Sequence, residues 1–237
     1  MYQTYSLIFW MPARNLSGEE MKSIVRKTVS ELDSFYDGNF TLYSRAYKKS
    51  ACKKIENLDE NISKELNKKR TVKDLDMGIG CSFGFFSSFN EDESLGLSFH
   101  LGSRDSMFID NIIIHLPLNT FPNPEIFNKI CILFKNIISF AGPYYAFMEN
   151  GLVERGPSGF WDDKPTIAHT LNYYNKEICN KIGVGKFKGL SGTENYCGGI
   201  FLKLLDEPMD INVPSHMDIK KSTEKQLCFV DRKRPST

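Results

Sequence analysis

The stretch Gly78–Pro117 reads GIGCSFGFFSSFNEDESLGLSFHLGSRDSMFIDNIIIHLP and contains three apolar-rich runs in close succession. The runs are Ile79–Phe89, Leu95–Leu101 and Phe108–Leu116. Short segments rich in Asn, Asp, Ser and Gly separate the runs, and these residue types tolerate tight turns. The pattern predicts an antiparallel meander of three strands over residues 79–116.

Helical patterns stand on both sides of this meander. Ser17 and Glu20 have the spacing of a capping box, and apolar residues recur at helical spacing from Met21 to Phe35. Pro124–Ala141 has a favourable start, a wide apolar face and a Gly-Pro stop, which together predict a second long helix. We further expect a surface helix at 53–70, helices at 167–181 and 215–227, strands at 1–10, 40–47, 144–148 and 199–205, and loops at 149–165 and 183–195.

Segregated strands and helices with a central meander are typical of the α+β class. The sequence therefore predicts one α+β domain over residues 1–230, with a central, mostly antiparallel sheet covered by helices. Residues 231–237 form a basic tail that contains Arg232, Lys233 and Arg234. We see no linker, repeat or low-complexity segment that would divide the chain.

Composition excludes several classes of function. The chain has 30 basic and 29 acidic residues, so its net charge of +1 argues against a dedicated nucleic-acid binder. The amino terminus resembles a first strand rather than a signal peptide, and no run approaches the ~18–20 apolar residues of a membrane helix. The six cysteines form no C-x-x-C pair, which favours reduced thiols. We expect a cytoplasmic protein without membrane attachment.

Motifs that would carry chemistry are weak. The glycines of 183–189 surround Lys186, but the spacing of a phosphate-binding loop is absent. No G-x-S-x-G motif is present, and the histidines at 100, 115, 169 and 216 lack the paired spacing of a helical metal site. His100 lies opposite the apolar face of its strand, beside Ser98, where a structural role is the simplest interpretation. We therefore predict no catalytic residue, no metal and no cofactor.

Surface character points instead to a protein partner. Acidic clusters occupy predicted loops, and aromatic residues stand beside one of them in the loop 149–164. A large aromatic side chain ringed by charge is the usual composition of a binding hot spot. A second interpretation places Trp161 in the core, and Trp161→Ala would separate the two, through lost affinity or lost thermal stability. The predicted partner-binding residues are Phe160, Trp161, Asp162, Asp163, Glu91, Asp92 and Glu93.

The order of these elements resembles the immunity protein 52 family of bacterial polymorphic toxin systems. The meander carries the resemblance, together with VGKFKGLS at 184–191, GGIFLKLLDEP at 198–208 and His216 at the start of the last helix. The match in order and size spans about residues 2–228. The resemblance implies a cytosolic, non-enzymatic protein that binds a cognate toxin domain, commonly a nuclease of the restriction-endonuclease type. Binding would block the active site of the toxin or the assembly that it needs.

Two other functions stay open on sequence grounds. One is a small cytosolic enzyme whose site is assembled from distant residues, for example His100 with Glu149 or Asp162. The other is a structural adaptor. An enzyme needs a concave pocket with convergent polar groups, whereas a binding protein needs an exposed and partly apolar patch.

Overall fold

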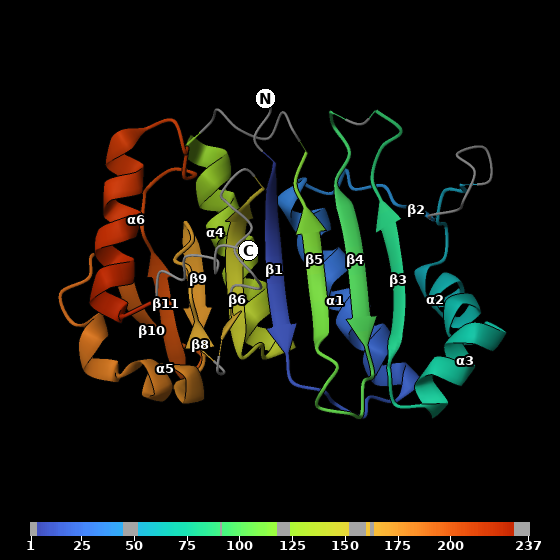
Figure 1. Ribbon diagram of the computed structural model, residues 1–237. Coiled ribbons are helices and arrows are strands. Elements are labelled where there is room, and N and C mark those ends of the chain that lie inside the picture. The colour runs from blue at the N-terminus through green and yellow to red at the C-terminus, as the bar shows by residue number, and fades with distance from the viewer. Residues whose placement is uncertain are drawn as a thin grey trace, which may run out of the picture.

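The computed structural model describes residues 4–44, 52–90, 92–117, 124–151, 160–161 and 164–229. In this part of the chain, nine strands form one open antiparallel sheet, and six α-helices lie around it (Figure 1). The predicted class, a single α+β domain with a central antiparallel sheet, is confirmed.

The sheet runs from a C-terminal edge to an N-terminal edge. Its strands, in spatial order, are β10 (Thr193–Tyr196), β11 (Gly199–Lys203), β9 (Leu171–Tyr174), β6 (Tyr145–Asn150), β1 (Tyr5–Met11), β5 (Asp110–His115), β4 (Gly96–Leu101), β3 (Cys81–Phe86) and β2 (Tyr43–Ser44). A separate two-stranded hairpin joins β7 (Phe160–Trp161) and β8 (Lys164–Pro165). The helices are α1 (Gly18–Phe35), α2 (Leu58–Leu66), α3 (Lys69–Asp76), α4 (Pro124–Ala141), α5 (Lys176–Ile182) and α6 (Pro214–Leu227), with a 3₁₀ helix at Val184–Phe187.

The predicted meander forms β3, β4 and β5 in antiparallel register. Phe83 pairs with Phe99, and Phe99 pairs with Ile112, so the apolar residues of the three strands share one face. The backbone amide of Ser87 donates to the Leu95 carbonyl at 3.0 Å and closes the first turn. Each strand is shorter than its apolar run because the end residues belong to the turns.

α1 and α4 pack against the apolar face of the sheet and form its main helical layer (Figure 1). The predicted capping box is present, since the Glu20 amide donates to Ser17 Oγ at 3.3 Å and the Ser17 amide donates to Glu20 Oε2 at 2.7 Å. The predicted helix at Pro124–Ala141 is also confirmed, and it buries Phe134 against Phe9 with ring centroids 5.1 Å apart.

A second helical layer covers only part of the opposite face. α5, the 3₁₀ helix and α6 lie over β6, β9 and β11 and enclose a smaller core around Tyr145 and Tyr174. The described helices leave the same face of β5, β4 and β3 uncovered, as Figure 1 shows for the right half of the sheet. This uncovered region is the most distinctive feature of the architecture.

Three predicted elements are wrong. The helix expected at 53–70 is instead α2 and α3, because Asn57 caps a new start by accepting from the Glu60 amide and the first helix ends at Leu66. The helix expected at 167–181 contains β9 and then α5, and Asn175 caps α5. The loop expected at 183–195 holds the 3₁₀ helix and the start of β10.

Candidate functional site: the open face of the sheet

Strand alternation sends every second side chain of β3, β4 and β5 away from the helical layer of α1 and α4. We call these side chains the open face. Direct pairing places them in three rows across the strands, because paired residues point to the same side. The rows are His115, Gly96 and Phe86; Ile113, Ser98 and Gly84; and Asn111, His100 and Ser82.

The open face carries no Lys, Arg, Asp or Glu, although a quarter of the chain is charged. Its centre consists of the small residues Ser98, Gly84 and Gly96 beside Ile113. When one face of a sheet is solvated, buried apolar residues usually alternate along each strand with polar residues on the solvated face. Long charged side chains are common among those polar residues. The cores of protein interfaces are, in contrast, depleted of charge. The composition of the open face is that of a flat contact surface.

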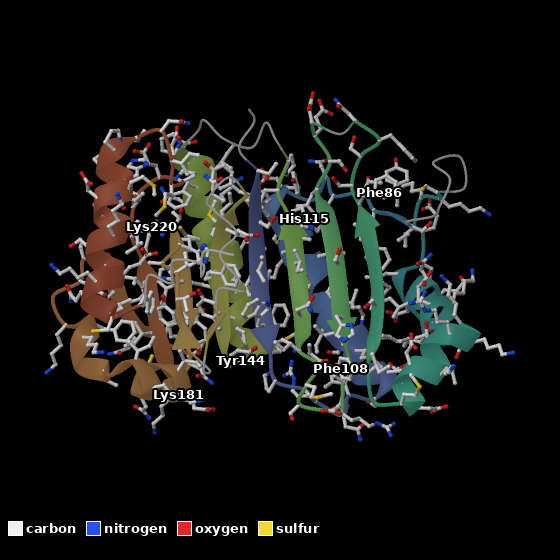
Figure 2. The ribbon with its side chains drawn as sticks, in the orientation of Figure 1. Phe86, Phe108, His115, Tyr144, Lys181 and Lys220 are labelled. Atoms are coloured by element: carbon white, nitrogen blue, oxygen red, sulfur yellow. The ribbon has the colours of Figure 1, made fainter. Side chains whose placement is uncertain are left out.

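Exposed apolar groups stand at both ends of the open face. At one end, Tyr43, Phe86 and Phe89 form an aromatic cluster with ring centroids 4.8 to 5.5 Å apart. At the other end Ile109 is 39% exposed, and Met107 in the adjoining turn is 79% exposed. Figure 2 shows Phe86 and His115 at the first end and Phe108 and Tyr144 at the second. The two ends of the open face therefore present large apolar side chains, and its centre presents small ones.

Two predicted site residues, Asp92 and Glu93, lie exposed in the turn between β3 and β4, next to the aromatic cluster. The turn is held by its own bonds: the Asp92 amide donates to Asn90 Oδ1 at 3.2 Å, and the Glu93 amide donates to the Asn90 carbonyl at 3.2 Å. The carboxylates of both residues form no ion pair with any described residue. Many other surface carboxylates do, for example Asp59 with Arg26 at 2.7 Å.

The other predicted site residues stay predictions. Glu91, Asp162 and Asp163 lie outside the described residues, as do the side chains of Phe160 and Trp161. The backbones of Phe160 and Trp161 form β7, so the loop predicted at 149–165 contains a short hairpin. The aromatic cluster was missed from the sequence because Tyr43 is about forty residues from Phe86. The four Phe of residues 83–89 were its only signal in the sequence.

Two serine–histidine contacts cross the strands. Ser82 Oγ lies 2.7 Å from His100 Nδ1, while His100 Nε2 lies 2.9 Å from the Ile79 carbonyl. A carbonyl only accepts hydrogen bonds, so Nε2 carries a proton, and in the neutral ring Nδ1 then accepts from the serine hydroxyl. Ser6 Oγ lies 2.8 Å from His115 Nδ1 in the same way. Both contacts join a hydroxyl to an imidazole that could act as a base.

The structure does not bring His100 and Glu149 together. Glu149 pairs with Ser6 on β1, whereas His100 lies on β4, three strands away from β6. At about 4.8 Å per strand this separation is roughly 14 Å, too far for proton transfer between the side chains. In a catalytic triad a carboxylate orients the histidine, but at His100 that place is taken by the Ile79 carbonyl and the Ser103 hydroxyl.

The remaining histidines are His169, which precedes β9, and His216 in α6. His169 is buried and stacks on Phe147 at 4.4 Å, and burial, with a smaller contribution from Lys220, lowers the pKa of His169 to about 3. His216 is also buried and lies between the Asp210 amide at 3.1 Å and the Glu207 carboxylate at 3.2 Å. Packing and hydrogen bonds hold both imidazoles in place.

Two hollows of the described surface lie away from the open face. One of about 350 Å³ lies between α1, α2 and α3, with Met21, Leu66 and Leu75 in its walls and Lys22 and Arg104 at its rim. Another of about 210 Å³ lies between α1 and α4. In the described ranges, no cluster of three or more His, Cys, Asp or Glu is arranged to hold a metal ion. None of the described helices combines the length and the apolarity that crossing a bilayer requires.

Comparison with known proteins gives a structural match. The chain is similar in structure to the T6SS protein PA0821 of Pseudomonas aeruginosa, with a TM-score of 0.65 and 9% sequence identity. The match covers 96% of this chain and 73% of that protein. At this identity the likeness shows a shared fold. No family model matches the chain, and no curated protein matches it, so the resemblance to the immunity protein 52 family rests on the residues quoted above.

Proposed function

We propose that the chain is a non-enzymatic immunity protein that binds and neutralises a cognate bacterial toxin domain through its open face. The observation that carries this proposal is an uncovered, uncharged sheet face with exposed apolar groups at both ends. An uncovered sheet face of this composition is typical of a protein-binding surface. The fold shared with a T6SS protein and the resemblance to an immunity family support the same class.

The test is co-expression in a bacterial host with the C-terminal domain of the large protein encoded next to this chain. The wild-type chain should restore growth and should co-purify with that domain. Ser98→Arg places a large cation at the centre of the open face, where its burial in a contact would be uncompensated. We expect this variant to weaken binding at least ~100-fold, which corresponds to about 3 kcal/mol.

The matched control is Ser139→Arg. Ser139 is an exposed serine on α4, in the helical layer on the other side of the sheet. It receives the same chemical change without altering the open face. Full protection by both variants would contradict the use of this face, and growth arrest despite a folded wild-type chain would contradict the immunity function itself.

A second candidate function is an enzyme centred on the Ser82–His100 contact, which is the specific observation that favours it. A hydroxyl within hydrogen-bond reach of an imidazole is the minimal arrangement of an activated nucleophile. The two functions differ in one experiment, in which all four histidines are replaced by Gln. A binding protein should keep its affinity apart from losses of stability. A folded variant that binds the toxin but no longer protects would favour the enzyme.

A further inference from the structure

The hollow of about 350 Å³ between α1, α2 and α3, which we call the α1–α3 hollow, has the size of a small-ligand site. Its walls come from four separate parts of the chain, which meet only in the folded protein (Figure 1). Leu16 and Met21 come from the segment that begins α1, Leu66 ends α2, and Leu75 lies on α3. These side chains give the hollow an apolar interior that could surround a short hydrocarbon chain.

The polar groups of the α1–α3 hollow are hydrogen-bond donors without partners. The Arg104 guanidinium forms no hydrogen bond or ion pair with any described residue, and neither do the side-chain amides of Asn15 and Asn67. Lys22, in contrast, is paired with Glu19 at 2.7 Å. None of the described lining residues is acidic. The rim therefore presents one cation that has no bonded counter-ion in the part of the chain that the structure describes.

Carboxylates that are close to the lining in sequence are bonded elsewhere. Asp105 follows Arg104, but its Oδ1 accepts from the Met107 amide at 2.9 Å. Glu20 accepts from the Ser17 amide at 2.7 Å and completes the capping box of α1. The carboxylate that would pair with the guanidinium is thus one that a ligand can supply.

The turn that carries Arg104 is held from inside the molecule. The buried Asp110 carboxylate accepts from the Gly102 amide at 3.1 Å and from the Ser103 amide at 2.9 Å. The Arg104 amide itself donates to the Gly78 carbonyl at 2.9 Å, where α3 ends. These bonds fix the backbone of this wall before a ligand binds, so binding would cost little ordering of the turn.

We propose that the α1–α3 hollow binds a small carboxylate with an apolar chain, of the class of medium-chain fatty acids. Leu16, Met21, Leu66 and Leu75 would surround the chain, and the Arg104 guanidinium would form paired hydrogen bonds with the carboxylate. One guanidinium without a counter-ion matches a head group of one negative charge. The hollow lies away from the open face, so this inference does not rest on the proposed function.

The probe is octanoate, titrated into the methyl-labelled full chain below its micelle concentration and followed by methyl shifts. We expect saturable shifts at Met21, Leu66 and Leu75, and none at Ile132 and Leu133, which line the hollow between α1 and α4. Butanoate and hexanoate should bind more weakly, by roughly two- to fourfold for each methylene that no longer enters the hollow. Octanol keeps the chain but removes the charge, and octyl phosphate changes the head group.

Arg104→Gln tests the contact with the head group. The side chain is exposed and unbonded, so the variant should fold like wild type. We expect it to weaken octanoate binding roughly 5- to 30-fold and to leave octanol binding within about twofold. The matched control is Arg70→Gln, which removes the same charge from an α3 side chain that is 94% exposed and outside the described lining. This control should bind octanoate within about twofold of wild type.

Gly18→Leu tests the interior. A Cβ at Gly18 would lie 3.6 Å from Leu66 Cδ1, which is ordinary contact, so a longer side chain would occupy the α1–α3 hollow. This variant should melt within a few degrees of wild type and should weaken octanoate and octanol alike, at least ~10-fold. Arg104→Gln provides the same decision if Gly18→Leu does not fold.

Several outcomes would overturn the inference. They are the absence of saturable shifts, shifts that concentrate at the open face or at Ile132 and Leu133, and equal losses of octanoate affinity in Arg104→Gln and Arg70→Gln. Tighter binding of octyl phosphate than of octanoate would contradict the carboxylate as the head group. A chain that binds octanoate in the hollow but fails to protect cells from the toxin contradicts the immunity function alone.

Discussion

At the scale of single residues, Tyr174 carries a buried hydroxyl that has no hydrogen-bond partner among the described residues. Burial raises the pKa of Tyr174 well above its ordinary value, so the group stays neutral. An unsatisfied buried hydroxyl costs free energy that its removal recovers. We predict that Tyr174→Phe leaves the free energy of unfolding unchanged or raises it by up to about 1 kcal/mol, as measured by urea denaturation.

The neighbouring residue is the control for this prediction. Tyr173 donates its hydroxyl to the Cys197 carbonyl at 3.1 Å, so Tyr173→Phe removes a hydrogen bond that is made. This variant should lower the free energy of unfolding by about 1 kcal/mol. A larger loss for Tyr174→Phe than for Tyr173→Phe would show that the Tyr174 hydroxyl is satisfied in solution.

His169 predicts a dependence of stability on pH. Burial and nearby Lys220 lower the pKa of His169 from 6.5 to about 3, so the unfolded chain binds a proton there before the folded chain does. The stability that depends on neutral His169 is complete above pH 6.5 and is lost as the pH falls from 6.5 towards 3, by on the order of 1 kcal/mol per pH unit. His169→Phe keeps the stacking on Phe147 and should flatten this slope between pH 6.5 and 4.5. An unchanged slope in urea denaturation would contradict the assignment.

At the scale of elements, the pairing of β11 with β9 depends on a glycine. A Cβ at Gly199 would lie 2.2 Å from the Tyr174 carbonyl oxygen and 2.9 Å from Asn175 Cα, both backbone atoms that cannot move aside. Gly199→Ala should therefore separate β11 from β9 and lower the free energy of unfolding by about 2–4 kcal/mol. For a chain of this length the melting temperature should fall by roughly 5–15 °C.

Gly185 provides the matched control for Gly199. A Cβ at Gly185 would meet no atom within 4 Å, and its φ is not in the left-handed region. Gly185→Ala should melt within about 2 °C of wild type. Similar melting of Gly199→Ala and Gly185→Ala in a thermal scan would mean that the close approach of β9 and β11 is not maintained in solution.

The elements also show which secondary structure cannot be predicted from sequence patterns. The four residues of β9 are all buried because helices cover both faces of the sheet there, so the strand shows no alternation. A short apolar run without alternation is compatible with a strand or a buried helix. α4, in contrast, has eighteen residues, one apolar face and clear terminal signals, and its bounds were predicted from those features alone.

At the scale of the whole molecule, the reactivity of the cysteines measures how accessible the core is to solvent and reagents. All six are free thiols. Cys197 and Cys228 are exposed, whereas burial raises the pKa of Cys81 to about 12 and that of Cys179 to about 11. A native chain treated with iodoacetamide at pH 8 should be alkylated first at Cys197 and Cys228, because the buried thiols are neither accessible nor ionised.

Mass spectrometry of the alkylated chain would check this order. Cys81 and Cys179 should react only when denaturant unfolds the chain, and the freshly unfolded chain should then titrate as six thiols. Early alkylation of Cys81 in the absence of denaturant would show that the layer of α1 and α4 opens locally. Fewer than six thiols would contradict the reduced state that the sequence predicts.

The sequence by itself determined the meander, the capping box of α1 and the extent of α4, because alternation, capping and helical periodicity are complete within a short window of chain. Only the tertiary structure decided which side of the meander is covered. That outcome depends on β1, which pairs with β5 and β6 roughly 100 or more residues away, and on the position of α5 and α6 at the far end of the sheet. A different non-local pairing, that of β2 with β3, brings Tyr43 to Phe86 and Phe89. A candidate site made in this way has no local signature, since its residues become neighbours only when distant strands pair.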